Sequence, residues 1–346
     1  CFYTFNYSSI QFMLRNFLLS PRTFVRMSST KSQLISQPFK MENTQMIRET
    51  ARKFPRPNFI SFDLFGTLYV PKKPVPQQYY EIAYHEFGIN KSIQSIEEEF
   101  PIVYDEMLQS YPNYGKGHPK FDNCDSWWKE LIIRLFQLDR HDDQALALCH
   151  RLIHHFTSEE AYSVYDDVVP TLQALQKQGV KLIVASNSDP RALTILESLK
   201  IKQYFHCSEH FHCSGVFLSY DSDYSKPTKA FFDEIALVEY RAHVDANYRS
   251  KNYPPGDFLS DCWHVGDSYN NDYIGAVRAG WNGVLLDRNH TSEFFKNVRK
   301  PQNDGCFLNE NPETKRDGQT GNEMLILANN RVVITKLTQL LDIFKL

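Results

Sequence analysis

The 346-residue chain lacks the features that mark secreted, membrane-spanning or nucleic-acid-binding proteins. Its seven cysteines are scattered and odd in number and form no C-x-x-C pair, which suits a reducing compartment better than a disulfide scaffold. No apolar run reaches the roughly 18 residues that a membrane span needs. The formal net charge is only −3, which gives no indication of nucleic-acid binding. These absences leave a globular chain that is long enough to bury a core.

Acidic residues are also missing from the first 41 residues, which contain five basic ones. From Met13 onward this segment is rich in Arg and Ser, as mitochondrial presequences are. We therefore predict that residues 1–41 form a presequence or a disordered extension outside the fold. A presequence at 13–41 would direct the protein to the mitochondrial matrix, and without one we expect a cytoplasmic or nuclear protein.

Apolar runs typical of buried parallel strands alternate with segments of helical periodicity. The first run, 58–63, ends at Asp63, and the second, 180–187, is entered through Gly179. Further strands are predicted at 216–219, 262–266, 283–286 and 331–334, and helices at 188–200, 227–238, 271–280 and 335–344. This alternation predicts an α/β fold, namely a three-layer, doubly wound parallel sheet with a Rossmann-like core.

A long helical block separates the first two strands. Apolar residues recur at helical spacing in 77–88, 93–109, 126–138, 142–156 and 167–178. Because this block cannot lie inside the sheet, we predict an inserted helical cap at 71–167 and a core made of 58–70 and 168–346. Two polar stretches of the core, 243–261 and 299–322, are predicted to be loop-like inserts, the second of them mobile.

Four polar groups of residues follow predicted strands, where open α/β sheets bind their ligands. They are Asp63 with Thr67, Ser186 with Asn187, Lys226, and Asp267 with Asp272. The Ser186 hydroxyl and the Asn187 backbone N–H can bind an anionic oxygen, and the Lys226 ammonium can offset a carboxylate and a substrate phosphate. Each group alone is also explained by a turn or a helix cap. Their order along the chain predicts one shared site.

The run from Asp63 to Thr67 resembles the first motif of the haloacid dehalogenase-like hydrolases, D-x-D-x-T, in which the first Asp is the nucleophile. The string 110–115, the pair Trp127-Trp128 and the run 266–273 are similar to the subgroup named after haloacid dehalogenase-like hydrolase domain-containing protein three. The resemblance implies a small phosphorylated metabolite as the substrate and Mg²⁺ as the cofactor.

The resemblance also implies roles for individual residues. Asp63 would be the nucleophile and a Mg²⁺ ligand, Lys226 would neutralise charge, and Thr67, Ser186 and Asn187 would hold the phosphoryl oxygens. Mg²⁺ commonly takes one or two carboxylates, with water and phosphate filling the remaining positions. The further ligands would be Asp267 and the backbone carbonyl of Phe65, and Asp272 would orient a metal-bound water or Lys226.

Phe65 departs from the family motif, because the family's phosphatases carry a second Asp there as general acid and base. Such catalysis contributes about 10²- to 10⁴-fold, and a phenyl ring cannot supply it. Three functions stay open: a Mg²⁺-dependent phosphatase with reduced activity, a non-catalytic binding or interaction protein, and a metal-free dehalogenase-type hydrolase. The last is disfavoured by Asp267, where the true dehalogenases have Ser.

Two further features have both a functional and a purely structural interpretation. Tyr111, Asn113 and Tyr114 lie in a polar, aromatic loop between predicted cap helices and are candidates for substrate contact, although a structural turn explains them equally well. The crowded segment from His206 to Cys213 does not have the usual spacing of zinc ligands, so packed or exposed side chains are the better interpretation.

Overall fold

The computed structural model describes residues 54, 56–205, 215–246, 254–298, 313–316, 323–328 and 330–345. The predicted presequence and the segment from His206 to Cys213 lie outside these residues, so both stay predictions. Within the described residues, no helix combines the length and the apolar character that crossing a membrane requires.

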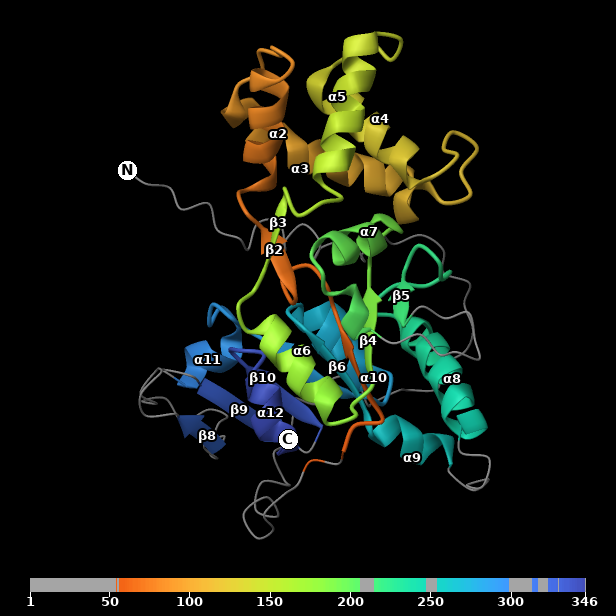
Figure 1. Ribbon diagram of the computed structural model, residues 1–346, viewed down its shortest axis with the longest axis vertical. Coiled ribbons are helices and arrows are strands. Elements are labelled where there is room, and N and C mark those ends of the chain that lie inside the picture. Colours follow the sequence, from red (N-terminus) through yellow and green to blue (C-terminus); the bar gives the residue numbers. More distant parts are fainter. Residues whose placement is uncertain are drawn as a thin grey trace, which may run out of the picture.

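An eight-stranded sheet forms the centre of the α/β part (Figure 1). Its order is β5-β4-β1-β6-β7-β10-β9-β8, and all pairs are parallel except β10 with β9 and β9 with β8. The bounds are β1 Phe59–Phe62, β4 Leu182–Ser186, β5 Val216–Leu218, β6 Cys262–Gly266, β7 Asn282–Leu286, β8 Glu313–Arg316, β9 Glu323–Ala328 and β10 Arg331–Ile334. The predicted parallel, Rossmann-like sheet is confirmed, with an antiparallel extension in addition.

The central strands are apolar because both of their faces are covered. Every residue of β1, β4, β6 and β7 is buried, which explains their continuous apolar runs. Phe62 of β1 pairs with Val184 of β4 on one side and Val265 of β6 on the other. This register aligns the carboxyl ends of the three strands at one edge of the sheet, where Asp63 and Ser186 stand.

Helices on both faces of the sheet make the three layers (Figure 1). Residues of α6 (Val168–Lys177), α7 (Arg191–Ser198) and α12 (Gln339–Phe344) share a hydrophobic cluster with Ile60 and Phe62. The second cluster joins Phe59 to α8 (Lys229–Ala246), α9 (Pro255–Ser260) and α10 (Gly275–Arg278). Alternate residues of β1 therefore face opposite layers. The α/β part also contains η3 (Lys202–Tyr204), the π-helical turn η4 (Tyr269–Ile274) and α11 (Glu293–Val298).

Four helices are inserted between the short strands β2 (Tyr69–Pro71) and β3 (Tyr162–Val164), which pair as an antiparallel ribbon. This helical insert consists of α2 (Val75–His85), α3 (Ile93–Ser110), the turn η2 (Asn113–Gly115), α4 (Cys124–Phe136) and α5 (Asp143–His155). Figure 1 shows it as a separate lobe beyond the carboxyl edge of the sheet, joined to the core through the ribbon. The predicted boundaries, 71–167, and the function as a cap stay predictions.

The loop prediction is wrong for parts of both polar stretches. In 243–261, α8 continues to Ala246 and α9 occupies Pro255–Ser260, with Phe258 buried. Proline at the start of α9 costs no helical hydrogen bond, so it marks the helix start and not a loop. In 299–322, residues 313–316 form β8 and pair with β9. Residues 247–253, 299–312 and 317–322 lie outside the described residues.

Candidate functional site

Asp63 stands directly after β1 at the carboxyl edge of the sheet. Its backbone N–H donates to the Val265 carbonyl at 2.9 Å, so strand pairing holds its main chain. The side-chain Oδ1 accepts a hydrogen bond from Lys226 at 2.7 Å, whereas no described residue donates to Oδ2. The side chain is 13% exposed. Asp63 therefore has one anchored oxygen and one oxygen available to an electrophile or a cation.

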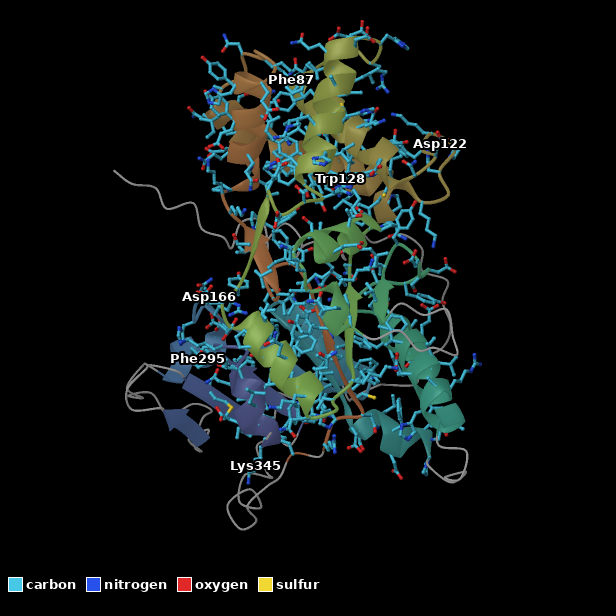
Figure 2. The ribbon with its side chains drawn as sticks, viewed as in Figure 1. Phe87, Asp122, Trp128, Asp166, Phe295 and Lys345 are labelled. Carbon is cyan, nitrogen blue, oxygen red and sulfur yellow. The ribbon has the colours of Figure 1, made fainter. Side chains whose placement is uncertain are left out.

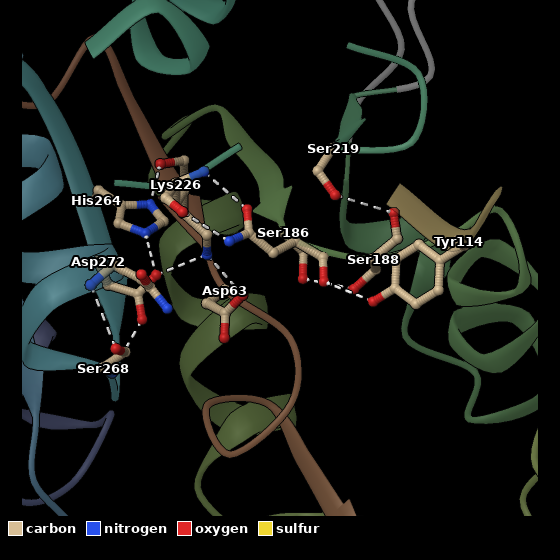
Figure 3. A network of polar contacts seen from close by, with 12 residues as sticks. Asp63, Tyr114, Ser186, Ser188, Ser219, Lys226, His264, Ser268 and Asp272 are labelled. Carbon is tan, nitrogen blue, oxygen red and sulfur yellow. Dashed lines mark hydrogen bonds and ion pairs between the residues drawn. The ribbon is translucent and has the colours of Figure 1, made fainter. Parts of the chain in front are cut away.

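Lys226 connects two acidic side chains at this edge (Figure 3). Its Nζ donates to Asp63 and, at 2.6 Å, to Oδ1 of Asp272, and its side chain is only 2% exposed. Asn187 holds the main chain of Lys226 through two hydrogen bonds of 2.8 Å, one to its carbonyl and one from its N–H. Burial lowers the pKa of Lys226, but the charges of Asp272 and Asp63 outweigh this effect and raise the pKa above its usual value.

Asp272 accepts hydrogen bonds from three directions. Lys226 and His264 donate to Oδ1, and the Ser268 backbone N–H donates to Oδ2 at 2.9 Å. Burial opposes ionisation, but the charge of Lys226 and the donated hydrogen bonds lower the pKa of Asp272 well below its usual value. Gly266 makes room for this carboxylate, because a Cβ there would lie 2.2 Å from the Asp272 Cγ.

His264 and Ser61 extend the network into the interior of the sheet, and both are fully buried. The ring Nε2 of His264 lies 2.9 Å from Asp272 Oδ1, and Nδ1 lies 2.6 Å from the Ser61 hydroxyl on the neighbouring β1. Burial lowers the pKa of His264. The neutral ring then donates from Nε2 to Asp272 and accepts the Ser61 hydroxyl at Nδ1. The sequence analysis did not predict this pair, whose signal is one polar residue within each of two apolar runs.

Asp267 completes an acidic group with Asp63 and Asp272. One carboxylate oxygen of each lies within 4.8 Å of the others. Burial raises the pKa of Asp63, with the Lys226 charge acting against the rise and the Asp272 charge adding to it. Two of these carboxylates, Asp63 and Asp272, divide one ammonium between them, and a group of negatively charged oxygen ligands suits a hard divalent cation. The donor set fits Mg²⁺.

The groups predicted to hold an anion lie at the same strand ends. Ser186 closes β4, and its Oγ is 2.8 Å from the Ser188 Oγ. The amide of Asn187 is engaged with Lys226, which leaves its backbone N–H for an anionic oxygen. Thr67 is fully buried, and its Oγ1 has no hydrogen-bond partner among the described residues. Because an unpaired buried hydroxyl is costly, a bound anionic oxygen would satisfy it.

Phe65, two residues after Asp63, is half-buried and offers no proton. Its ring packs edge-to-face on Tyr69, with ring centroids 6.3 Å apart. Gly66 follows with a φ of 82°, a left-handed conformation that favours glycine, and its N–H donates to the Tyr69 carbonyl. The backbone carbonyl of Phe65 belongs to this turn, and its role as a metal ligand stays a prediction.

The insert residues expected to contact a substrate lie in different places. The ring of Tyr111 packs inside the insert, 4.9 Å from the Phe121 ring, and so does not join the strand-edge network. Asn113 crosses to the core and donates to the Ser219 carbonyl at 3.0 Å. Its neighbour Tyr114, a candidate from the same loop, donates to the Asn187 carbonyl at 3.2 Å (Figure 3). The segment 113–114 thus joins the insert to the site.

The haloacid dehalogenase-like hydrolase family model matches residues 58–280, which is more than half of the chain. Protein YMR130W of Saccharomyces cerevisiae is 29% identical over 301 residues, covering 84% of this chain and 93% of that protein. Haloacid dehalogenase-like hydrolase domain-containing protein 3 of Danio rerio is 30% identical over 232 residues, covering 66% and 85%. The subgroup resemblance seen in the motifs is therefore confirmed.

A solved structure gives the same fold. The HAD-hydrolase YfnB from Bacillus subtilis, bound to magnesium, superposes with a TM-score of 0.51 at 12% sequence identity. The comparison covers 84% of this chain and 100% of that one. At this low identity the similarity concerns the fold.

Proposed function

Because the chain belongs to the haloacid dehalogenase-like hydrolases, we propose that it is a Mg²⁺-dependent phosphatase of a small phosphorylated molecule. The observation that carries this proposal is the Asp63 carboxylate, which has one oxygen held by Lys226 and one without a described donor. Two more carboxylates stand within 4.8 Å of it. This arrangement combines a positioned nucleophile with a cation site.

In the proposed reaction, the free oxygen of Asp63 attacks the phosphorus atom and forms an aspartyl-phosphate while the ester bond breaks. A water molecule then hydrolyses this intermediate and restores the carboxylate. Lys226 would hold Asp63 in place and offset negative charge, while Thr67 and Ser186 would donate to phosphoryl oxygens. The Asn187 backbone N–H would do the same.

Mg²⁺ would be held by Asp63, Asp267 and the backbone carbonyl of Phe65, with Asp272 orienting its surroundings. When bound, the ion would supply positive charge that stabilises the phosphoryl group during transfer. The surplus of carboxylates supports this assignment and disfavours a metal-free dehalogenase. The helical insert would act as a cap that excludes water and selects the substrate.

Phe65 limits the proposed reaction. The leaving oxygen must take its proton from water, since the phenyl ring has none to give, and this loss removes about 10²- to 10⁴-fold of rate. Activated esters, whose leaving groups need no proton, should therefore be the best substrates. The same observation supports a second candidate function, a binding or interaction protein that keeps the fold without turnover.

The full chain should be assayed with an activated aryl phosphate and with alkyl phosphate monoesters, each with and without Mg²⁺. We expect slow Mg²⁺-dependent turnover of the aryl ester that is lost in Asp63→Asn. Phe65→Asp restores a side chain that can donate a proton, so it should speed alkyl esters more than the aryl ester.

The controls separate the two candidate functions. Glu98→Gln, on an exposed position of α3, should behave like the parent. Turnover that survives in Asp63→Asn would contradict the nucleophile. No turnover in the parent with any ester would leave the binding protein as the function.

A further inference from the structure

Tyr114 belongs to the helical insert, yet its side chain ends at the site in the α/β core. Its hydroxyl donates to the Asn187 carbonyl at 3.2 Å (Figure 3). Its ring packs on both insert tryptophans, with centroids 5.5 Å from Trp127 and 6.1 Å from Trp128. Burial raises the pKa of Tyr114 well above its usual value, so the hydroxyl keeps the proton that it donates. Tyr114 is therefore a directed hydrogen-bond donor from one part of the chain to the other.

The backbone around Tyr114 has an unusual conformation. Asn113, Tyr114 and Gly115 have φ values of 49°, 55° and 74°, which makes three consecutive left-handed residues. Asn and Gly adopt this region readily, whereas a bulky aromatic residue rarely does and needs contacts that hold it there. A Cβ at Gly115 would lie 2.6 Å from the Phe121 ring, so the turn packs directly against the insert. Because a strained residue persists only where its surroundings hold it, the contact from Tyr114 to the core calls for a functional explanation.

Asn187, which accepts this hydrogen bond, connects the insert to the catalytic lysine. Its side-chain amide exchanges two hydrogen bonds of 2.8 Å with the main chain of Lys226. The Lys226 ammonium in turn donates to Asp63 at 2.7 Å. Tyr114 thus holds the carbonyl of Asn187, and Lys226 holds its side chain. The backbone N–H of Asn187, which would bind a phosphoryl oxygen, is fixed in direction by both contacts.

A second insert residue holds the same loop of the core. The Trp128 indole N–H donates to Asp189 at 2.8 Å, and the Arg191 guanidinium lies 4.1 Å above the Trp128 ring. Figure 2 shows Trp128 at the end of the helical insert that faces the α/β core. The loop after β4 is therefore held at Asn187 by Tyr114 and at Asp189 by Trp128. A loop that is fixed before its ligand arrives loses less freedom on binding, which favours affinity.

We propose that Tyr114 is a positioning residue of the phosphoryl site and acts through Asn187. This inference rests on the proposed phosphatase function and makes the affinity of its anion site depend on a residue of the insert. In the proposed mechanism Asn187 binds the phosphoryl group, whereas Asp63 and Asp267 hold Mg²⁺. Loss of the Tyr114 hydroxyl should therefore weaken the binding of phosphate and leave the binding of Mg²⁺ as it is. A purely structural role would not separate the two ligands in this way.

The test measures the binding of inorganic phosphate to the full chain in the presence of Mg²⁺ by titration calorimetry. Tyr114→Phe keeps the ring and removes only the hydroxyl. We expect the Kd for phosphate to rise about three- to tenfold, as the loss of one hydrogen bond predicts. The Kd for Mg²⁺, measured without phosphate, should be unchanged. An unchanged Kd for phosphate, or an equal rise for both ligands, would overturn the proposal.

Two control variants separate this contact from a general loosening of the insert. Lys116→Met removes another hydrogen bond from the insert to the core, which joins Nζ to the Asp221 carbonyl at 3.1 Å. Tyr80→Phe removes a hydroxyl from α2, where the ring stacks on Tyr84 with centroids 5.3 Å apart. Both variants should bind phosphate as the parent does. A rise in either control equal to that in Tyr114→Phe would contradict a specific role of Tyr114.

A double variant tests whether Tyr114 acts through Asn187. Asn187→Ala removes the amide that bonds to Lys226, and it should weaken phosphate binding at least as much as Tyr114→Phe does. If both side chains fix the same residue, the loss of one already releases it. The double variant should then bind phosphate about as Asn187→Ala does, because variants in one network are not additive. A Kd that rises by the full product of the two single effects would show that Tyr114 acts independently of Asn187.

The outcomes also separate this inference from the phosphatase function. If no ester is hydrolysed but phosphate binding depends on Tyr114, the phosphatase function fails and the positioning role stands. If esters are hydrolysed and Tyr114→Phe matches the parent in kcat/KM and in the Kd for phosphate, the positioning role fails and the phosphatase function stands. A parent that binds no phosphate would overturn the positioning role.

Discussion

Two buried polar clusters in this molecule balance charge in opposite ways. At the edge of the sheet, three carboxylates lie within 4.8 Å of one another, and two of them, Asp63 and Asp272, share the ammonium of Lys226. In the helical insert, the single carboxylate of Glu130 is 3% exposed and receives three cations at 2.7 to 2.9 Å. These cations are Lys120, Arg134 and Arg140.

The difference distinguishes an incomplete cluster from a complete one. Glu130 has all the partners that a buried carboxylate requires, so its cluster can serve the insert's own stability. The carboxylates at the sheet edge keep surplus negative charge, and like charges at close range are unfavourable unless a cation joins them. The comparison therefore indicates that the sheet edge, and not the Glu130 cluster, is where a cation would bind.

Removing Lys226 should break the sheet-edge cluster and have the largest effect. Lys226→Met leaves two buried carboxylates without their shared partner, and such a loss costs about 3 to 5 kcal/mol. We expect the free energy of unfolding, measured by urea denaturation in the presence of a chelator, to fall by this amount. Lys229→Met is the control, because Lys229 is 58% exposed and its pair with Asp233 contributes little. A similar change in both variants would mean that the buried network is not strongly coupled.

Adding Mg²⁺ should sharpen the comparison, since Asp63 and Asp272 divide one cation between them whereas Glu130 has three. A ligand at 100 times its Kd stabilises the native state by about 2.7 kcal/mol. We expect Mg²⁺ to raise the Tm of the parent in differential scanning calorimetry and to have no such effect on Asp267→Asn. Glu130→Gln should respond to Mg²⁺ as the parent does. A stabilisation that persists in Asp267→Asn would place the ion elsewhere.

The sequence was sufficient to predict the sheet edge because its signals are local. Asp63, Ser186 and Asp267 each follow an apolar run, and parallel strands bring their carboxyl ends to one edge. The roles of these residues stay predictions, since geometry alone does not test them. Phe65 was equally visible as a departure from the family motif.

Contacts between distant segments were not predictable in the same way. Arg191 meets Trp128 across the boundary between core and insert, and no local pattern relates the two. Tyr111 looked like a substrate contact, but its ring packs within the insert, which only the tertiary structure could show. Strand β9 is a different case, because its apolar run and that of β10 flank two asparagines, a hairpin signal that was overlooked.

Neutralising Glu130 should perturb the complete cluster and have the smallest effect. Burial raises the pKa of Glu130, but hydrogen bonds from Arg140, Lys120 and Arg134 outweigh this and lower the pKa to about 2. The three cations are 33%, 32% and 53% exposed, so solvent screens part of the interaction. We expect Glu130→Gln to lower the free energy of unfolding by about 1 to 2 kcal/mol at neutral pH.

The pH dependence of this difference tests its origin. A carboxyl whose folded pKa is depressed stabilises the native state above its unfolded pKa, and this contribution is lost as pH falls toward the folded pKa. The gap between the parent and Glu130→Gln in urea unfolding should therefore be constant above about pH 5 and shrink between about pH 4.5 and 2. Glu98 is exposed, so Glu98→Gln should not differ from the parent in unfolding free energy to a comparable extent. If the difference in unfolding free energy stays unchanged down to pH 3, Glu130 stabilises the insert through packing and shape. Its negative charge would then not be what balances the three cations.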